Sequence, residues 1–126
     1  MSDKASRSMD GTVKIVDNVF VKMIHLNGIG DNVHGHAHKF DHITLLAIGS
    51  VKMLCKNTEK NYTAPCLIVT PKNIVHEFIS LEDKAILCCI HAIRNGDEME
   101  DVAPQDISEK EALSLLTTYN LINEIN

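Results

Sequence analysis

The stretch from Gly30 to Gly49 reads GDNVHGHAHKFDHITLLAIG and holds four of the seven histidines of this 126-residue chain. Imidazole is the commonest metal ligand in proteins and binds in its neutral form. If the segment is a strand, His36 and His38 point to the same side with Cα atoms roughly 6.6 Å apart, and both rings can reach one ion. The chain must turn after His38 to bring His42 to that ion. The stretch therefore indicates a metal site.

Length, composition and charge frame this interpretation. A chain of 126 residues with 44% hydrophobic residues fits one globular domain, which can bury about two-thirds of its unfolded surface. The formal net charge of -5 comes without any basic run, which argues against nucleic acid and anionic membranes as partners. No segment approaches 18 consecutive apolar residues, and residues 1–10 lack the apolar region of a signal peptide. We expect a cytoplasmic protein.

Short segments rich in β-branched and apolar residues alternate with turn residues at spacings near ten residues. This pattern predicts an all-β sandwich or barrel over residues 11–96, after a disordered tail of residues 1–10. The expected strands are Val13–Val16, Val19–Leu26, Ile43–Ile48, Val51–Lys56, Cys66–Thr70, Val75–Ser80 and Ala85–Ile93. The expected turns are Asp17–Asn18, Gly28–Asn32, Asn57–Asn61, Pro71–Asn73 and Leu81–Lys84.

Residues 97–126 carry a helical pattern. Ser108 and Glu111 form a capping box, in which each side chain can bond to the other residue's backbone amide. Apolar residues then recur at helical spacing, at Ala112, Leu115, Leu116, Tyr119 and Ile122. We expect a linker and one short amphipathic helix that covers the barrel or a partner subunit.

The four cysteines, Cys55, Cys66, Cys88 and Cys89, lie in apolar segments and form no Cys-x-x-Cys pair. In a reducing compartment such residues act as small buried hydrophobes. A disulfide between Cys55 and Cys66, across a hairpin, stays open on the sequence alone.

The histidine cluster resembles the first motif of the cupin superfamily. That motif is a Gly, five residues, His-x-His, three or four residues, Glu, six residues and Gly. This chain has Gly30, His36, His38, His42 and Gly49 at those spacings. The one departure is His42, which stands where the family usually has Glu.

A second segment resembles the other cupin motif, Gly, five residues, Pro-x-Gly, two residues, His, three residues, Asn. Pro71 and His76 keep the Pro and the His, and Asn73 replaces the central Gly, as Asn can where φ is positive. Pro65 and Ser80 depart from the pattern at its two ends. The resemblance covers about residues 13–95.

The resemblance implies a small single-domain cupin, a double-stranded β-helix or jelly roll that is usually a dimer and holds one metal ion in its lumen. Carried over residue by residue, the metal ligands are His36, His38, His42 and His76. An alternative register, His34-x-His36 with Asp41 as a carboxylate ligand, puts the following Gly one position out. Otherwise Asp41 is a candidate to orient a ligand imidazole, and His34 to line the pocket mouth.

Three other polar residues are expected to have mainly structural roles. Alternation along a strand sends Glu77 to the face opposite His76, where it is solvated rather than a catalytic base. His91 is expected to be a satisfied core or interface histidine. His25 is expected to pack in the same way, although a lumen-facing pose would let it contact a substrate.

The expected cofactor is one divalent transition metal, with Fe, Zn, Ni, Cu and Mn left open, because neutral imidazoles suit these ions better than Mg or Ca. All-histidine cupin sites look like those of oxygenases that cleave diketones, flavonols or related small molecules, and an isomerase or lyase is also open. Because His42 occupies the place of the family's glutamate base, a second class remains: a module that binds or senses a small molecule or metal without turnover. The expected partners are a small-molecule ligand and a second copy of the chain.

Overall fold

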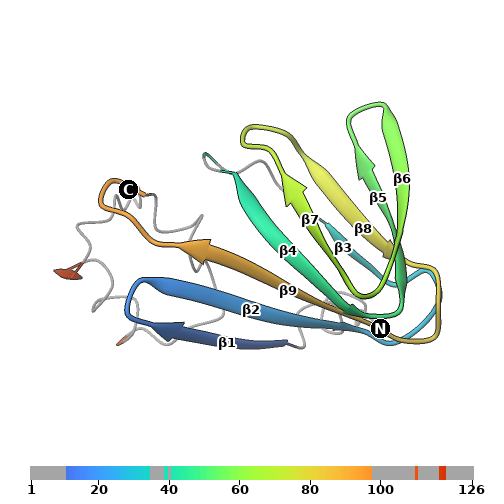
Figure 1. Ribbon diagram of the computed structural model, residues 1–126, viewed down its shortest axis with the longest axis horizontal. Helices are drawn as coiled ribbons and strands as arrows, with labels where there is room; N and C mark the ends of the chain where they lie inside the picture. Colours follow the sequence, from blue (N-terminus) through green and yellow to red (C-terminus); the bar gives the residue numbers. More distant parts are fainter. Residues whose placement is uncertain (1–10, 35–38, 40, 98–109, 111–116, 119–126) are drawn as a thin grey trace.

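Two antiparallel sheets form the part of the chain that the computed structural model describes, residues 11–34, 39, 41–97, 110, 117 and 118 (Figure 1). The five-stranded sheet has the order β1 (Gly11–Val16), β2 (Val19–Leu26), β9 (Ala85–Ala92), β4 (His42–Ile48) and β7 (Cys66–Thr70). The four-stranded sheet has the order β3 (Asn32–His34), β8 (His76–Ser80), β5 (Ser50–Cys55) and β6 (Thr58–Thr63). Neighbours in each sheet are mostly distant in sequence, as in a jelly roll.

One face of each sheet is buried against the other sheet, because side chains alternate between the two faces of a strand. The buried positions of β4 begin with His42, and those of β8 begin with His76. The apolar core between the sheets consists of Ile24, Leu26, Leu46, Val51, Met53, Ile68, Phe78, Ala85 and Leu87. The two histidines therefore enter the same interior from opposite sheets.

All seven predicted strands are present, with ends within two residues of those predicted. The predicted turn at Asn57–Asn61 is wrong: the turn is only Lys56–Asn57, and β6 follows it. The side chains of β6 are almost all exposed, so the strand has no apolar alternation to reveal it. Its backbone pairing with β5 holds it in the sheet.

Left-handed backbone conformations occur at the motif positions where the family pattern has glycine. Gly30 has φ 91° and Gly49 has φ 90°, and Asn73, which replaces a motif Gly, has φ 63°. A Cβ atom added to Gly49 would overlap the carbonyl oxygen of Lys84. The Gly49 turn is thus required by both conformation and close packing.

The four cysteines are free thiols. Cys55 lies on β5 and Cys66 on β7, in different sheets, so the disulfide left open by the sequence is not formed.

Three residues of the predicted C-terminal helix, Lys110, Thr117 and Thr118, are described, and all three are helical and exposed. The rest of that helix and the predicted tail of residues 1–10 lie outside the described residues. None of the described residues belongs to a helix with the length and apolar character needed to cross a membrane.

Candidate metal centre

His42 and His76 lie side by side between the two sheets. His42 begins β4 and His76 begins β8, and the two side chains are only 8% and 6% exposed. Their ring centroids are 5.3 Å apart, with 51° between the ring planes. The rings of His76 and Phe78 also form a T-shaped pair, with centroids 5.6 Å apart. The two motifs of the sequence thus meet at one end of the interior.

This separation fits two imidazoles on one ion. Bonds of about 2 Å from each ring nitrogen to a shared metal put the two ring centroids about 4.5 to 5.5 Å apart. Imidazole is also the right donor chemistry for Zn, Cu, Fe or Ni. His42 and His76 therefore suit a transition-metal ion, although the described residues include no group of three or more His, Cys, Asp or Glu side chains arranged to hold one.

The other two predicted ligands, His36 and His38, lie outside the described residues. The described chain leads towards them from β3, which ends at His34. The backbone of His34 is paired with Glu77, the neighbour of His76 in sequence.

Asp41 links the two motifs through a backbone contact. The amide N–H of Lys72, in the turn before β8, donates to Asp41 Oδ1 over 2.7 Å. Asp41 is exposed. Among the described residues, its hydrogen-bond partner is this amide and not an imidazole. The contact fixes the start of β4 against the turn that leads to His76.

The β register determines which inward-facing side chains surround His42. Thr70 on β7 is the direct backbone partner of His42. On the other side of β4, the pairing with β9 ends at Ile43 and Ile90. Thr70 is 1% exposed, and its Oγ1 has no hydrogen-bond partner among the residues that the structure describes.

The next inward row lies one step deeper. Thr44 Oγ1 donates to the sulfur of Cys89 over 3.7 Å. Burial raises the pKa of the Cys89 thiol, and this hydrogen bond and the charge of Lys22 oppose the effect. Thr44 is fully buried, so it matches Thr70 in type and burial but has a hydrogen-bond partner.

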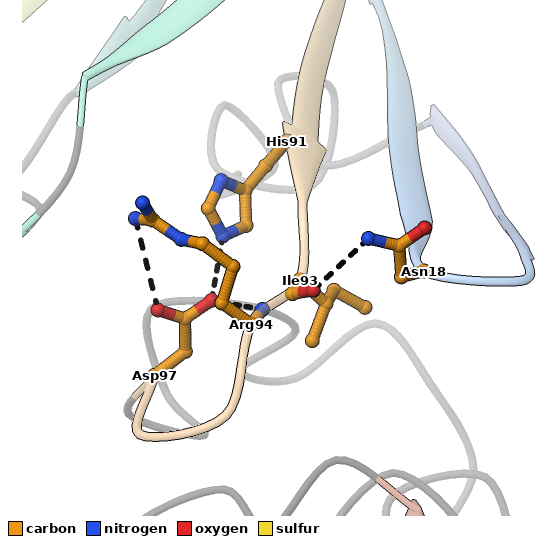
Figure 2. A network of polar contacts seen from close by, with 5 residues as sticks. All are labelled: Asn18, His91, Ile93, Arg94 and Asp97. Atoms are coloured by element: carbon orange, nitrogen blue, oxygen red, sulfur yellow. Dashed lines mark hydrogen bonds and ion pairs between the residues drawn. The ribbon is translucent and has the colours of Figure 1, made fainter.

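His91 is held by an acidic partner at the end of β9 (Figure 2). Its Nε2 lies 2.9 Å from Oδ2 of Asp97, and both side chains are almost buried. The amide of Arg94 donates to the same Oδ2 over 2.8 Å. Asn18, in the β1–β2 turn, donates through its side-chain amide to the Ile93 carbonyl over 3.2 Å. His91 is thus a buried, hydrogen-bonded histidine, as expected.

Glu77 and His25 lie on outward faces of their sheets. Glu77 alternates with the buried His76 and accepts a 2.6 Å hydrogen bond from the Asn32 side-chain amide. His25 alternates with the buried residues Ile24 and Leu26. A shallow depression of about 270 Å³ is lined by Leu54, Lys56, Val75, His76 and Glu77. Neither Glu77 nor His25 therefore faces the interior.

Two interior residues near the histidines were not found from the sequence. Cys55 is the backbone partner of His76, and it packs against the core. Thr70 is the partner of His42. The sequence predicts Cys55 as a small buried hydrophobe or half of a hairpin disulfide and Thr70 as the end of a strand, because nothing local reveals which residues of distant strands pair.

Comparison with known proteins supports the fold. No family model matches the sequence, and no match was found among curated proteins. Among solved structures, a cupin-2 domain containing protein from Shewanella frigidimarina is 15% identical, with a TM-score of 0.54 over 65% of this chain and 80% of that one.

Two further structures agree. A cupin superfamily protein from Desulfitobacterium hafniense is 13% identical, with a TM-score of 0.58 over 66% of this chain and 75% of that one. An RmlC-like cupin family protein with a double-stranded β-helix fold, from Methanocaldococcus jannaschii, is 15% identical, with a TM-score of 0.57 over 65% of this chain and 79% of that one. The described part of this chain therefore has the cupin fold, a double-stranded β-helix.

Proposed function

We propose that this chain holds one divalent transition-metal ion in its lumen and binds a small oxygen-bearing organic molecule there, as a dioxygenase-type enzyme. The ligands are His36, His38, His42 and His76. The observation that carries the proposal is the 5.3 Å separation of the buried His42 and His76 rings. Two neutral imidazoles at that distance have the donor chemistry and the spacing for one ion.

Chain connectivity supports the two remaining ligands. His36 is two positions after His34 in the chain, which limits their Cα distance to about 7 Å. Because His34 pairs with Glu77, His36 stays within reach of His76. His42 is four positions after His38, a span of at most about 14 Å. Both side chains can therefore come to the same ion.

The chemistry follows from the charge of the ligand set. Four neutral imidazoles leave the full +2 charge on the centre, so an anionic oxygen ligand is favoured. When bound, the ion acts as a Lewis acid towards such an oxygen and as a route for electrons. The interior residues exclude bulk water, which strengthens these electrostatic interactions. The four free thiols fit a reducing compartment, and we expect the protein to act in the cytoplasm.

One observation favours a second candidate function, capture of the small molecule without turnover. The family's usual glutamate is replaced by His42, and Glu77 faces outward with Asn32 as its partner. Asp97, the acidic group next to this end of the interior, is engaged by His91 and the Arg94 amide. Among the described residues, no carboxylate is thus assigned as a catalytic base.

Metal content tests the proposed centre. Untagged wild-type protein at pH 7.5 should contain about one transition-metal ion per chain by elemental analysis. His76→Ala and His38→Ala should each abolish stoichiometric metal, because each removes one of the four proposed ligands. His25→Ala, which changes a histidine on the outer face, is the matched control and should keep it.

The same measurement has a pH dependence with a defined sign. Ligand imidazoles must be neutral, and an ordinary imidazole titrates near about pH 6.5. Metal content should therefore fall steeply between pH 7.5 and about pH 5. Equal metal content at both values, or equal loss in the His25 and His76 variants, would contradict the site.

Oxygen consumption separates the two candidate functions. The metal-loaded protein is offered a panel of 1,3-diketones and flavonols, and oxygen uptake is followed with an electrode. Uptake that depends on both metal and substrate supports the enzyme. Binding of panel members that shift the metal's absorption spectrum without oxygen uptake supports capture alone.

A further inference from the structure

We infer that Thr70 is a ligand-binding residue of the candidate metal centre, where its hydroxyl donates a hydrogen bond to an oxygen atom of an anionic carboxylate-type ligand. The inference rests on the proposed function and deepens it, because it names a residue outside the histidine set and a chemical class of ligand.

The position of Thr70 comes from the sheet register. Thr70 ends β7 and is the direct partner of His42, the first residue of β4. Both residues belong to the buried, inward-facing set of their strands. Side chains of directly opposed residues on one face have Cβ atoms about 4.5 to 5.5 Å apart. The hydroxyl thus lies on the same face as the His42 ring and next to it.

The Thr70 hydroxyl also has no hydrogen bond to any of the described residues. Thr70 is 1% exposed, and among the described residues nothing bonds to its Oγ1. Buried polar groups are nearly always hydrogen-bonded, and an unmade bond destabilises the folded protein. By contrast, the equally buried Thr44 donates to Cys89. A buried hydroxyl that has no partner within the described part of the chain, next to the candidate metal ligand His42, fits a site for an additional polar molecule.

Charge indicates which molecule would complete this bond. The imidazole of His42 is the direct neighbour of Thr70, and His91 and Phe20, which pair with each other, lie on the inward faces of β9 and β2. Asp97 is paired with His91 and does not compete for the Thr70 hydroxyl. A divalent ion held by neutral imidazoles favours an anionic oxygen, and a hydroxyl is a good donor to such an oxygen.

Acetate binding to the cobalt-loaded protein tests the inference. Cobalt(II) replaces the native metal, and its visible absorption reports when an anion enters the coordination sphere. Thr70→Val keeps the shape of the side chain and removes only the hydroxyl. We expect acetate to bind the Thr70 variant about tenfold more weakly than wild type, as for a lost hydrogen bond to a charged group. Cobalt affinity itself should change little.

Thermal unfolding of the metal-free proteins gives a second readout, with Thr44→Val as the matched control. Because the Thr70 hydroxyl has no hydrogen-bond partner among the residues that the structure describes, Thr70→Val should raise the Tm of the metal-free protein by about 4 °C. Thr44→Val breaks the bond to Cys89, so it should lower the Tm and leave acetate affinity unchanged.

Each outcome decides between the inference and the proposed function. If wild type takes up no cobalt, the metal centre fails and the inference fails with it. If wild type binds cobalt but not acetate, or if Thr70→Val binds acetate as wild type does, the centre stands and the role of Thr70 is overturned. A lowered Tm in Thr70→Val, as in Thr44→Val, would show that the hydroxyl serves the fold.

Discussion

Cys89 shows how the register sets the chemistry of a single side chain. It lies on the inward face of β9, in one row with Lys22 and Thr44. Burial raises the pKa of its thiol because the thiolate is poorly solvated, and this effect exceeds the lowering by Thr44 and Lys22. The neutral thiol therefore stabilises the fold below the ordinary thiol pKa of about 8.5, and this contribution is lost as the pH rises above it.

We predict that Cys89 resists alkylation in the native protein. The thiolate is the reactive form, and a raised pKa keeps its fraction low at pH 7.5. In a Cys88→Ala background, mass spectrometry of iodoacetamide-treated protein should find Cys89 unlabelled at pH 7.5 and labelled at pH 10. The same protein unfolded in guanidinium should be labelled at both values. Rapid labelling of native protein at pH 7.5 would contradict the burial argument.

At the scale of elements, the turns at Gly49 and Gly30 differ in what surrounds them. Both have φ near 90°, which costs any L-residue about 1–2 kcal/mol. At Gly49 a Cβ would also meet the backbone of Lys84 and Ala85, which cannot easily move aside. At Gly30 nothing lies within 4 Å of the added atom.

We predict that Gly49→Ala destabilises the protein more than Gly30→Ala. The Gly30 variant should lose about 1 kcal/mol of unfolding free energy from backbone strain alone. The Gly49 variant should lose about 3 kcal/mol or more, because strain and steric overlap add. Urea unfolding followed by circular dichroism measures both values. Equal losses would mean that the β4–β5 turn relaxes around the new methyl group.

Elements also mark the limit of what the sequence reveals. Apolar alternation predicts strands such as Val19–Leu26, and the motif spacing brings His42 and His76 into one site. The exposed edge strand β6 was missed because solvent-facing residues carry no pattern. The pairings of Thr70 with His42 and of Cys55 with His76 were also missed. They depend on how distant strands cross between sheets, which no local periodicity encodes.

At the scale of the whole molecule, the outer face of the five-stranded sheet is mostly apolar. Outward positions of neighbouring strands form two continuous rows: Val21, Ile90, Ile43 and Val69 in the first, and Met23, Cys88, Leu45 and Leu67 in the second. On β7, Leu67 and Val69 are 65% and 63% exposed. Contiguous apolar patches of several hundred Å² are uncommon on monomers and mark interfaces.

We propose a second copy of the chain as the partner of this face. Strand spacing and rise make the face roughly 20 Å by 20 Å, and among its described outward positions Lys14 is the charged residue. A flat apolar surface with so little charge cannot repel its own copy, and a two-fold axis lets the same patch serve both subunits.

Sedimentation equilibrium tests this dimer. Wild type should have twice the 14.0 kDa chain mass at micromolar concentration. The double variant Leu67→Lys, Val69→Lys should weaken association by about a hundredfold or more, since burying two unpaired ammonium groups costs several kcal/mol. Val75→Lys, at a comparably exposed position in the turn before β8, should leave it unchanged. If the wild type is a monomer, the dimer proposal is wrong, and the next candidate to cover this face is the chain's own segment of residues 98–126.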